Sequence, residues 1–127
     1  MAKKKAFETD KAAILGGPYS QAIIHNGLIF ISGQGAIDPQ TNEVMHGTIE
    51  KEAELSMENI RIILEEAGSS LDKVLQVTVY LLDIGEYNRF NEVYKRYFQG
   101  DLPARTCIQA ARLPFGIRVE IDAVAYI

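Results

Sequence analysis

The sequence predicts a single α+β domain in which a mixed β-sheet carries two helices on one face. Two segments repeat their apolar residues at helical spacing, whereas the others alternate or flank hairpin signals, as strands do. These segments follow one another in the order β-β-α-β-α-β-β, which is typical of an α+β fold. The length of 127 residues indicates one domain, residues 1–127, and the hydrophobic content of 47% is enough for a core.

The first two strands are expected at residues 21–24 and 28–32. They flank Asn26-Gly27, a strong signal for a two-residue hairpin because both residue types tolerate a positive φ angle.

A long helix is expected over residues 49–67, with Thr48 as its N-cap and Gly68 as its stop. Steps of three and four place its apolar residues on one face: Ile49, Ala53, Met57, Ile60, Leu64 and Ala67. A second helix is expected over residues 83–98, since Asp83 and Glu86 resemble a capping box. Its buried stripe is expected to hold Tyr87, Phe90, Tyr94 and Tyr97.

Three further strands complete the predicted sheet. Residues 74–82 alternate, with an apolar face made of Leu75, Val77, Val79 and Leu81. The segments 105–111 and 118–127 are separated by a turn, so they are expected to pair as a hairpin. In the last strand one face is suited to receive the helices: Val119, Ile121, Ala123, Ala125 and Ile127.

Two helices can cover only one face of such a sheet. The other face is expected to hold Thr78, Tyr80, Cys107, Val124 and Tyr126, mixed with charged residues. This mixture is too apolar for full exposure and too polar for a core, which predicts burial against identical subunits.

Composition excludes several classes of function. A net charge of −4 disfavours nucleic-acid binding, and a single cysteine, Cys107, precludes an internal disulfide. With only His25 and His46 as histidines, a metal site is not expected. No apolar run approaches the roughly 20 residues of a membrane span, and no signal core follows the charged N-terminus, so we expect a cytoplasmic protein.

The residues suited to chemistry lie in the last two strands. Arg105 and Cys107 are two residues apart and share a face, and Glu120 joins them if the two strands pair. Arginine suits a carboxylate ligand, and a half-buried glutamate can exchange a proton near neutral pH. Two simpler interpretations stay open. Arg105 and Glu120 could form a cross-strand ion pair, and Cys107 could be a small buried residue.

At these residues the chain resembles the Rid family of reactive-intermediate deaminases, also called the YjgF family. The resemblance extends over nearly the whole chain and rests on six segments in order: Gly17-Pro18-Tyr19-Ser20-Gln21-Ala22, Ile31-Ser32-Gly33-Gln34, Phe90-Asn91-Glu92-Val93-Tyr94, Pro103-Ala104-Arg105-Thr106-Cys107, Ala111-Arg112-Leu113-Pro114 and Val119-Glu120-Ile121.

This resemblance implies a chorismate-mutase-like fold, a homotrimer and three clefts between subunits. It implies cofactor-free and metal-free hydrolysis of 2-iminobutanoate and 2-iminopropanoate to 2-oxo acids and ammonia. The carboxylate-binding arginine of the family falls on Arg105, and its proton-handling glutamate falls on Glu120. Its substrate-binding positions fall on Tyr19, Ser32, Gly33, Asn91 and Cys107, together with Arg105.

Two departures from the family pattern fall at the expected cleft rim and bear on the preferred size of the substrate. Gly16 is an extra glycine, and Phe115-Gly116-Ile117 replaces a more polar loop.

Other classes of function would use a similar cleft or fold. These are a non-catalytic module that binds 2-oxo acids, an endoribonuclease and a chorismate mutase. The acidic charge argues against the nuclease, and the scarcity of cleft cations argues against the mutase.

Overall fold

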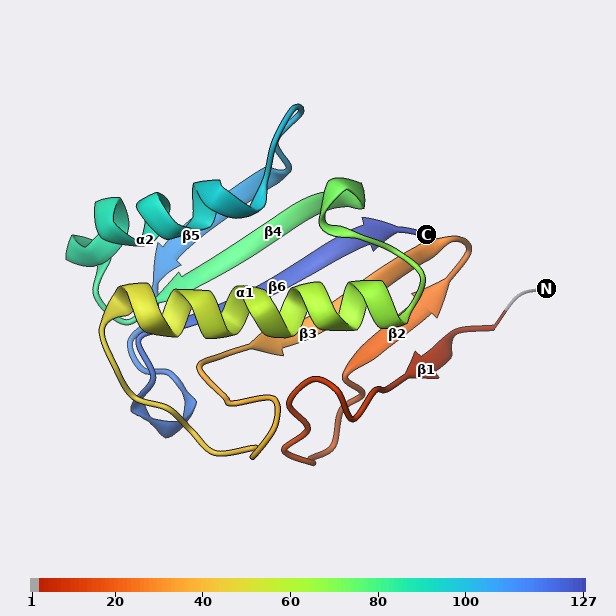
Figure 1. Cartoon of the computed structure of the whole chain (residues 1–127), viewed down its shortest axis with the longest axis horizontal. Coiled ribbons are helices and arrows are strands. Elements are labelled where there is room, and N and C mark those ends of the chain that lie inside the picture. The colour runs from red at the N-terminus through yellow and green to blue at the C-terminus, as the bar shows by residue number, and fades with distance from the viewer. Residues whose placement is uncertain (1–2) are drawn as a thin grey trace.

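The computed structural model describes residues 3–127. Six strands form one sheet in the order β1-β2-β3-β6-β4-β5, and both helices lie on one face of it (Figure 1). The strands are β1 (Lys5–Phe7), β2 (Ala22–His25), β3 (Leu28–Gln34), β4 (Val74–Leu81), β5 (Ala104–Gln109) and β6 (Val119–Tyr126). The helices are α1 (Ile49–Glu66) and α2 (Tyr87–Tyr94). The α+β class, the mixed sheet and the one-sided helices are therefore confirmed. Only β1 has no counterpart among the expected strands.

The first hairpin and the first helix match their predictions. Asn26 and Gly27 have φ angles of 50° and 76° and join β2 to β3. Thr48 caps α1, because its side chain accepts a hydrogen bond from the Lys51 amide at 3.3 Å. The apolar stripe of α1 is buried against the sheet, so this helix supplies most of the core that lies above β3 and β6.

The second helix is shorter than expected. The segment 83–98 contains α2 flanked by two 3₁₀ turns, Ile84–Glu86 and Lys95–Tyr97. Phe90 and Tyr94 are buried as predicted, but Tyr87 is 37% exposed and Val93 takes its place in the core. The buried stripe of so short a helix spans two turns, and Tyr87 lies outside it, beside Arg105 on the edge strand β5.

A second correction concerns the start of β4. The pairing register with β6 shifts between Val74 and Gln76, as at a β-bulge. Val74 is consequently buried, whereas Leu75 is 46% exposed and does not belong to the apolar face. Val77, Val79 and Leu81 are buried as expected.

The last two strands do not form the expected hairpin. β6 lies between β3 and β4 and pairs antiparallel with both, whereas β5 pairs parallel with β4 at the sheet edge. The connection passes around the end of β4, where the Leu82 amide donates to the Arg118 carbonyl and the Ala110 amide donates to Leu81. Burial explains the order, because the fully apolar face of β6 belongs at the sheet centre and the more exposed β5 suits an edge.

Four of the five residues expected on the helix side of the last strand are buried there, from Val119 to Ala125, but Ile127 lies beyond β6 and is 41% exposed. Within residues 3–127, no helix combines the length and the apolarity that crossing a bilayer would require.

Candidate functional site

Arg105 and Glu120 lie on opposite faces of the sheet. In the register of β4 and β5, Arg105 is opposite Val77, which is buried beneath the helices. Glu120 is opposite Tyr80, and Tyr80 points away from the helices because it alternates with the buried Val79. The expectation that both side chains share one face is therefore wrong. It rested on a β5–β6 hairpin, and β4 separates the two strands instead.

The same register places Cys107 on the helix side. Cys107 is opposite Val79 and packs against the core, so it does not belong to the uncovered face, where Thr78, Tyr80, Val124 and Tyr126 do lie. The cross-strand ion pair between Arg105 and Glu120 is also ruled out within one chain.

Aromatic rings of α2 hold the Arg105 side chain. Its guanidinium carbon lies 4.6 Å from the centre of the Tyr94 ring and 5.5 Å from that of Tyr87. One guanidinium nitrogen donates a hydrogen bond to the Tyr87 hydroxyl at 3.1 Å. None of the ion pairs among residues 3–127 includes Arg105. Its charge is thus positioned by cation–π contacts yet left without a carboxylate partner.

Arg105 contributes to an open hollow of about 350 Å³, which we call the arginine hollow. It is lined by Asn91, Glu92, Tyr94, Lys95, Leu102, Pro103 and Arg105. The side-chain oxygen of Asn91 and the hydroxyl of Tyr94 are buried, and neither has a hydrogen-bond partner among residues 3–127. Burial raises the pKa of Tyr94 to about 12, although the charge of Arg105 opposes the shift. The hollow therefore offers the Arg105 cation, and two unsatisfied polar atoms are buried in the residues of its wall.

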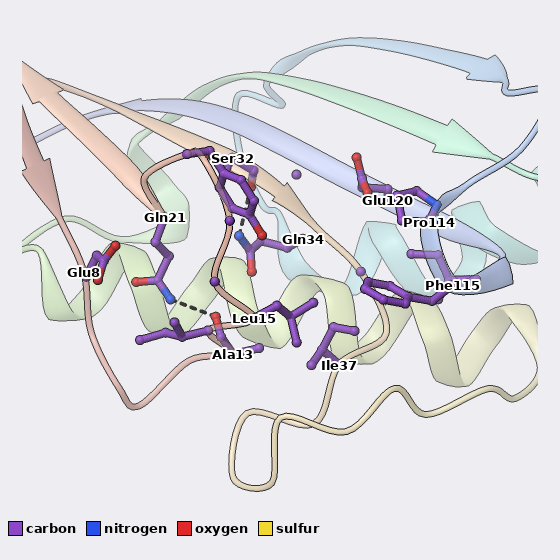
Figure 2. Close-up of a pocket in the computed structure, with 17 residues that line it drawn as sticks. Glu8, Ala13, Leu15, Gln21, Ser32, Gln34, Ile37, Pro114, Phe115 and Glu120 are labelled. Atoms are coloured by element: carbon purple, nitrogen blue, oxygen red, sulfur yellow. Dashed lines mark hydrogen bonds between the residues drawn. The ribbon is translucent and has the colours of Figure 1, made fainter.

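Glu120 lines a separate and larger cavity of about 400 Å³, which we call the glutamate pocket. Tyr19, Ser32 and Gly33 also line it. Figure 2 labels Ser32 and Glu120 in this pocket. A side chain at position 33 would collide with the Glu120 carboxyl group, which would then have to move from its present place against Gly33. Burial, and then the charge of Asp122, raise the pKa of Glu120 above its ordinary value. The carboxyl group can accordingly hold a proton at higher pH than an exposed glutamate.

Two buried amide side chains hold the walls of the glutamate pocket. Gln21 donates to the Ala13 carbonyl at 2.9 Å and accepts from the Thr9 amide at 2.8 Å. Asn59, fully buried in α1, accepts from the Ala13 amide and donates to the Ile37 carbonyl, both at 2.8 Å. Neither residue is among the site residues predicted from the sequence. The available signal was an asparagine at a helix position that faces the core.

Cys107 lines neither the arginine hollow nor the glutamate pocket. Burial raises the pKa of its thiol, and the nearby charge of Arg105 only opposes this shift. The histidines are engaged elsewhere, His25 with Asn26 and His46 with the Phe115 carbonyl. This environment favours a protonated thiol rather than an activated nucleophile.

The seven site residues predicted from the sequence thus fall into three places. Tyr19, Ser32, Gly33 and Glu120 come together in the glutamate pocket; Asn91 and Arg105 come together in the arginine hollow; and Cys107 lies beside the core. Across residues 3–127, no three His, Cys, Asp or Glu side chains are grouped as metal ligands would be.

Comparison with known proteins gives a consistent result. Residues 10–127 match the family model described as Endoribonuclease L-PSP. The chain is 47% identical to a RutC family protein of Pyrococcus abyssi, over 99% of this chain and 98% of that protein. It is 43% identical to the 2-iminobutanoate/2-iminopropanoate deaminase of Mus musculus, over 96% of this chain and 90% of that protein. The crystal structure of RidA from an Antarctic Psychrobacter superimposes with a TM-score of 0.92 at 40% identity, covering 97% of this chain and 99% of that one.

Proposed function

The chain belongs to the Rid (YjgF) family, and we propose that it hydrolyses 2-iminobutanoate and 2-iminopropanoate to 2-oxo acids and ammonia. The observation that carries the proposal is the pair of complementary half-sites. One holds an arginine without a carboxylate partner, and the other holds a glutamate whose pKa is raised. The name of the mouse relative, which is 43% identical, supports the same reaction.

Because the two half-sites lie on opposite faces, one chain cannot bring them together. We propose that a homotrimer does so, with the arginine hollow of one subunit closing the glutamate pocket of the next. The helix-free face of the sheet carries Phe30, Ile108 and Tyr126, each more than 40% exposed. Symmetric association would bury this apolar surface. The number of subunits, three, comes from the family resemblance.

The first test is the mass in solution. Sedimentation equilibrium at micromolar concentration should give about three times the monomer mass, because a closed cyclic assembly leaves no copy of the apolar face exposed. A stable monomer at that concentration would contradict both the assembly and the shared site.

In the proposed reaction Arg105 binds the substrate carboxylate through two charge-assisted hydrogen bonds. Glu120 orients a water molecule against C2. The oxygen of this water forms the new bond to C2. The C2–nitrogen bond then breaks, and protons handled by Glu120 reach the nitrogen, which leaves as ammonia. Tyr19, Ser32, Gly33 and Asn91 complete the walls around the substrate. Water is the only other reactant, and orientation with proton transfer is sufficient for an intrinsically easy hydrolysis.

Cys107 has no covalent role in this mechanism. We expect Cys107→Ser to retain most of the deaminase activity. The thiol lines neither the arginine hollow nor the glutamate pocket, and its pKa is raised. Initial rates of the purified variant, with its assembly checked in parallel, test this. Complete loss of turnover in an intact assembly would instead indicate covalent catalysis.

A coupled assay separates the proposal from its alternatives. Threonine dehydratase generates 2-iminobutanoate in situ, and the protein should accelerate release of ammonia. A module that only binds 2-oxo acids would leave the rate unchanged. The family description as an endoribonuclease is tested with RNA as the substrate, although the net charge of −4 disfavours RNA binding. A cytoplasmic location and the removal of reactive imines as the physiological role belong to the same proposal.

A further inference from the structure

One end of the glutamate pocket is apolar. Leu15, Ile37 and Phe115 lie together there, on the side away from Ser32 and Glu120 (Figure 2). We call these three residues the apolar wing. Further apolar residues in the lining of the pocket are Ile14, Pro114 and Ile117. Ile117 itself is buried, whereas Leu15 and Phe115 are 42% and 58% exposed. The wing therefore offers uncovered apolar surface within the same cavity as the proposed reaction centre.

The backbone at Phe115 is held in an unusual conformation. Its φ angle is 62°, in the left-handed region that bulky residues rarely adopt. Nε2 of His46 donates a hydrogen bond to the Phe115 carbonyl at 2.6 Å, across 69 positions of sequence. The following residue, Gly116, donates its amide to the Leu113 carbonyl at 3.1 Å. Strain of this kind persists where the surroundings fix it, and here it presents an aromatic ring to a cavity.

The size of the cavity exceeds the needs of a small imino acid. A volume of about 400 Å³ lies in the range of roughly 300–1,000 Å³ that is typical of pockets for larger organic ligands. With its C2 carbon beside Glu120, 2-iminopropanoate would extend only a methyl group, which leaves the apolar wing without contact to the substrate. A branched or aromatic side chain would cover it.

We propose that the apolar wing, with Phe115 at its centre, is a specificity-determining subsite for 2-imino acids that carry bulky apolar side chains. It favours the imines of leucine or phenylalanine over 2-iminopropanoate. The proposal rests on the deaminase function proposed above, since the same pocket supplies Glu120. It goes further by assigning the substrate side chain to residues outside the family motifs.

The test compares two imines formed in situ by a flavin-dependent amino-acid oxidase with catalase, one from leucine and one from alanine. Wild-type protein should show the higher kcat/KM with the leucine-derived imine. In Phe115→Gly that preference should fall by about tenfold, because even one methylene in an apolar pocket changes the ratio by roughly 10–200-fold. The kcat/KM for the alanine-derived imine should fall much less, because its methyl group does not reach the wing. An unchanged ratio, or an equal loss with both substrates, would overturn the proposal.

Two controls keep the result interpretable. Glycine adopts a positive φ angle freely, so Phe115→Gly should fold at least as well as the wild type. Ile84→Ala removes a comparably exposed aliphatic side chain, 44% exposed, that lines neither hollow. It should leave the substrate ratio unchanged, and a change as large as that of Phe115→Gly would contradict a specific role for the wing.

Calorimetric binding of unreactive 2-oxo acids distinguishes failure of the wing from failure of the deaminase function. Wild-type protein should bind 4-methyl-2-oxopentanoate more tightly than pyruvate, and Phe115→Gly should lose the difference. If imine hydrolysis is absent but this preference remains, the deaminase proposal fails and the subsite stands. Equal affinities for both acids in the wild type would overturn the subsite.

Discussion

Arg105→Ala should lower kcat/KM for 2-iminobutanoate by about 100-fold or more. Two charge-assisted hydrogen bonds to the substrate carboxylate would be lost, each contributing roughly 1.5–3 kcal/mol. Arg105→Lys should rescue the activity only partly, because an ammonium group supplies charge without the planar fork. It would also stack less well on the Tyr94 ring, which lies 4.6 Å from the guanidinium carbon. Initial rates over a range of imine concentrations measure the effect.

The matched control for this variant is Tyr87→Phe. It removes the hydroxyl that accepts the 3.1 Å hydrogen bond from Arg105 but keeps both the charge and an aromatic ring. It should change kcat/KM far less than Arg105→Ala does. Thermal unfolding and sedimentation of both variants separate loss of assembly from loss of chemistry. Near-normal deamination by a well-folded Arg105→Ala assembly would overturn the proposed site.

Glu120→Gln should lower kcat by about 10²–10⁴-fold with little change in substrate affinity, since positioned acid–base groups typically contribute that much. The amide can still hydrogen-bond water but cannot exchange a proton. The pH–rate profile of the wild type should show an ionisation above the ordinary carboxyl range, because burial raises the pKa of Glu120. Glu120→Gln should lack this ionisation. A variant with the wild-type rate and profile would make Glu120 a structural residue.

Stability provides the control for Glu120→Gln. A carboxyl group whose pKa is raised on folding favours the folded state least above that pKa, where the buried form is charged. Its contribution is present at acidic pH and is lost as the pH rises through the folded value. The free energy of unfolding of Glu120→Gln should therefore equal or exceed that of the wild type at pH 8. A large loss of stability there would indicate a structural defect.

Local sequence signals predicted the elements whose structure depends on local interactions. The Asn26-Gly27 turn, the Thr48 cap and the apolar stripe of α1 all match, because turn chemistry, capping and helical periodicity act over a few residues. Such patterns do not predict the bulge at Val74 or the shortening of the second helix. They arise where pairing with β6 and the edge of the sheet compete with local preference.

Strand order is the larger difference between prediction and structure, and it changes the site. The alternation correctly gave Arg105 and Cys107 one common face and placed Glu120 opposite the buried face of its own strand. Alternation gives no information on which strands are neighbours, however, so a hairpin between β5 and β6 was assumed. The structure inserts β4 between them and divides the predicted site in two. A shared site between subunits restores the convergence that the residue types suggest.

Complementation between two inactive variants tests this shared site most directly. Arg105→Ala and Glu120→Gln, carrying different affinity tags, are co-expressed, and assemblies that contain both are isolated by sequential purification on the two tags. In a cyclic trimer of mixed composition, one site in about three then joins an intact Arg105 to an intact Glu120 of the partner subunit. We predict recovery of about one third of the wild-type deaminase activity, whereas each variant alone stays inactive. Mixed assemblies as inactive as their parents would contradict a site shared between subunits.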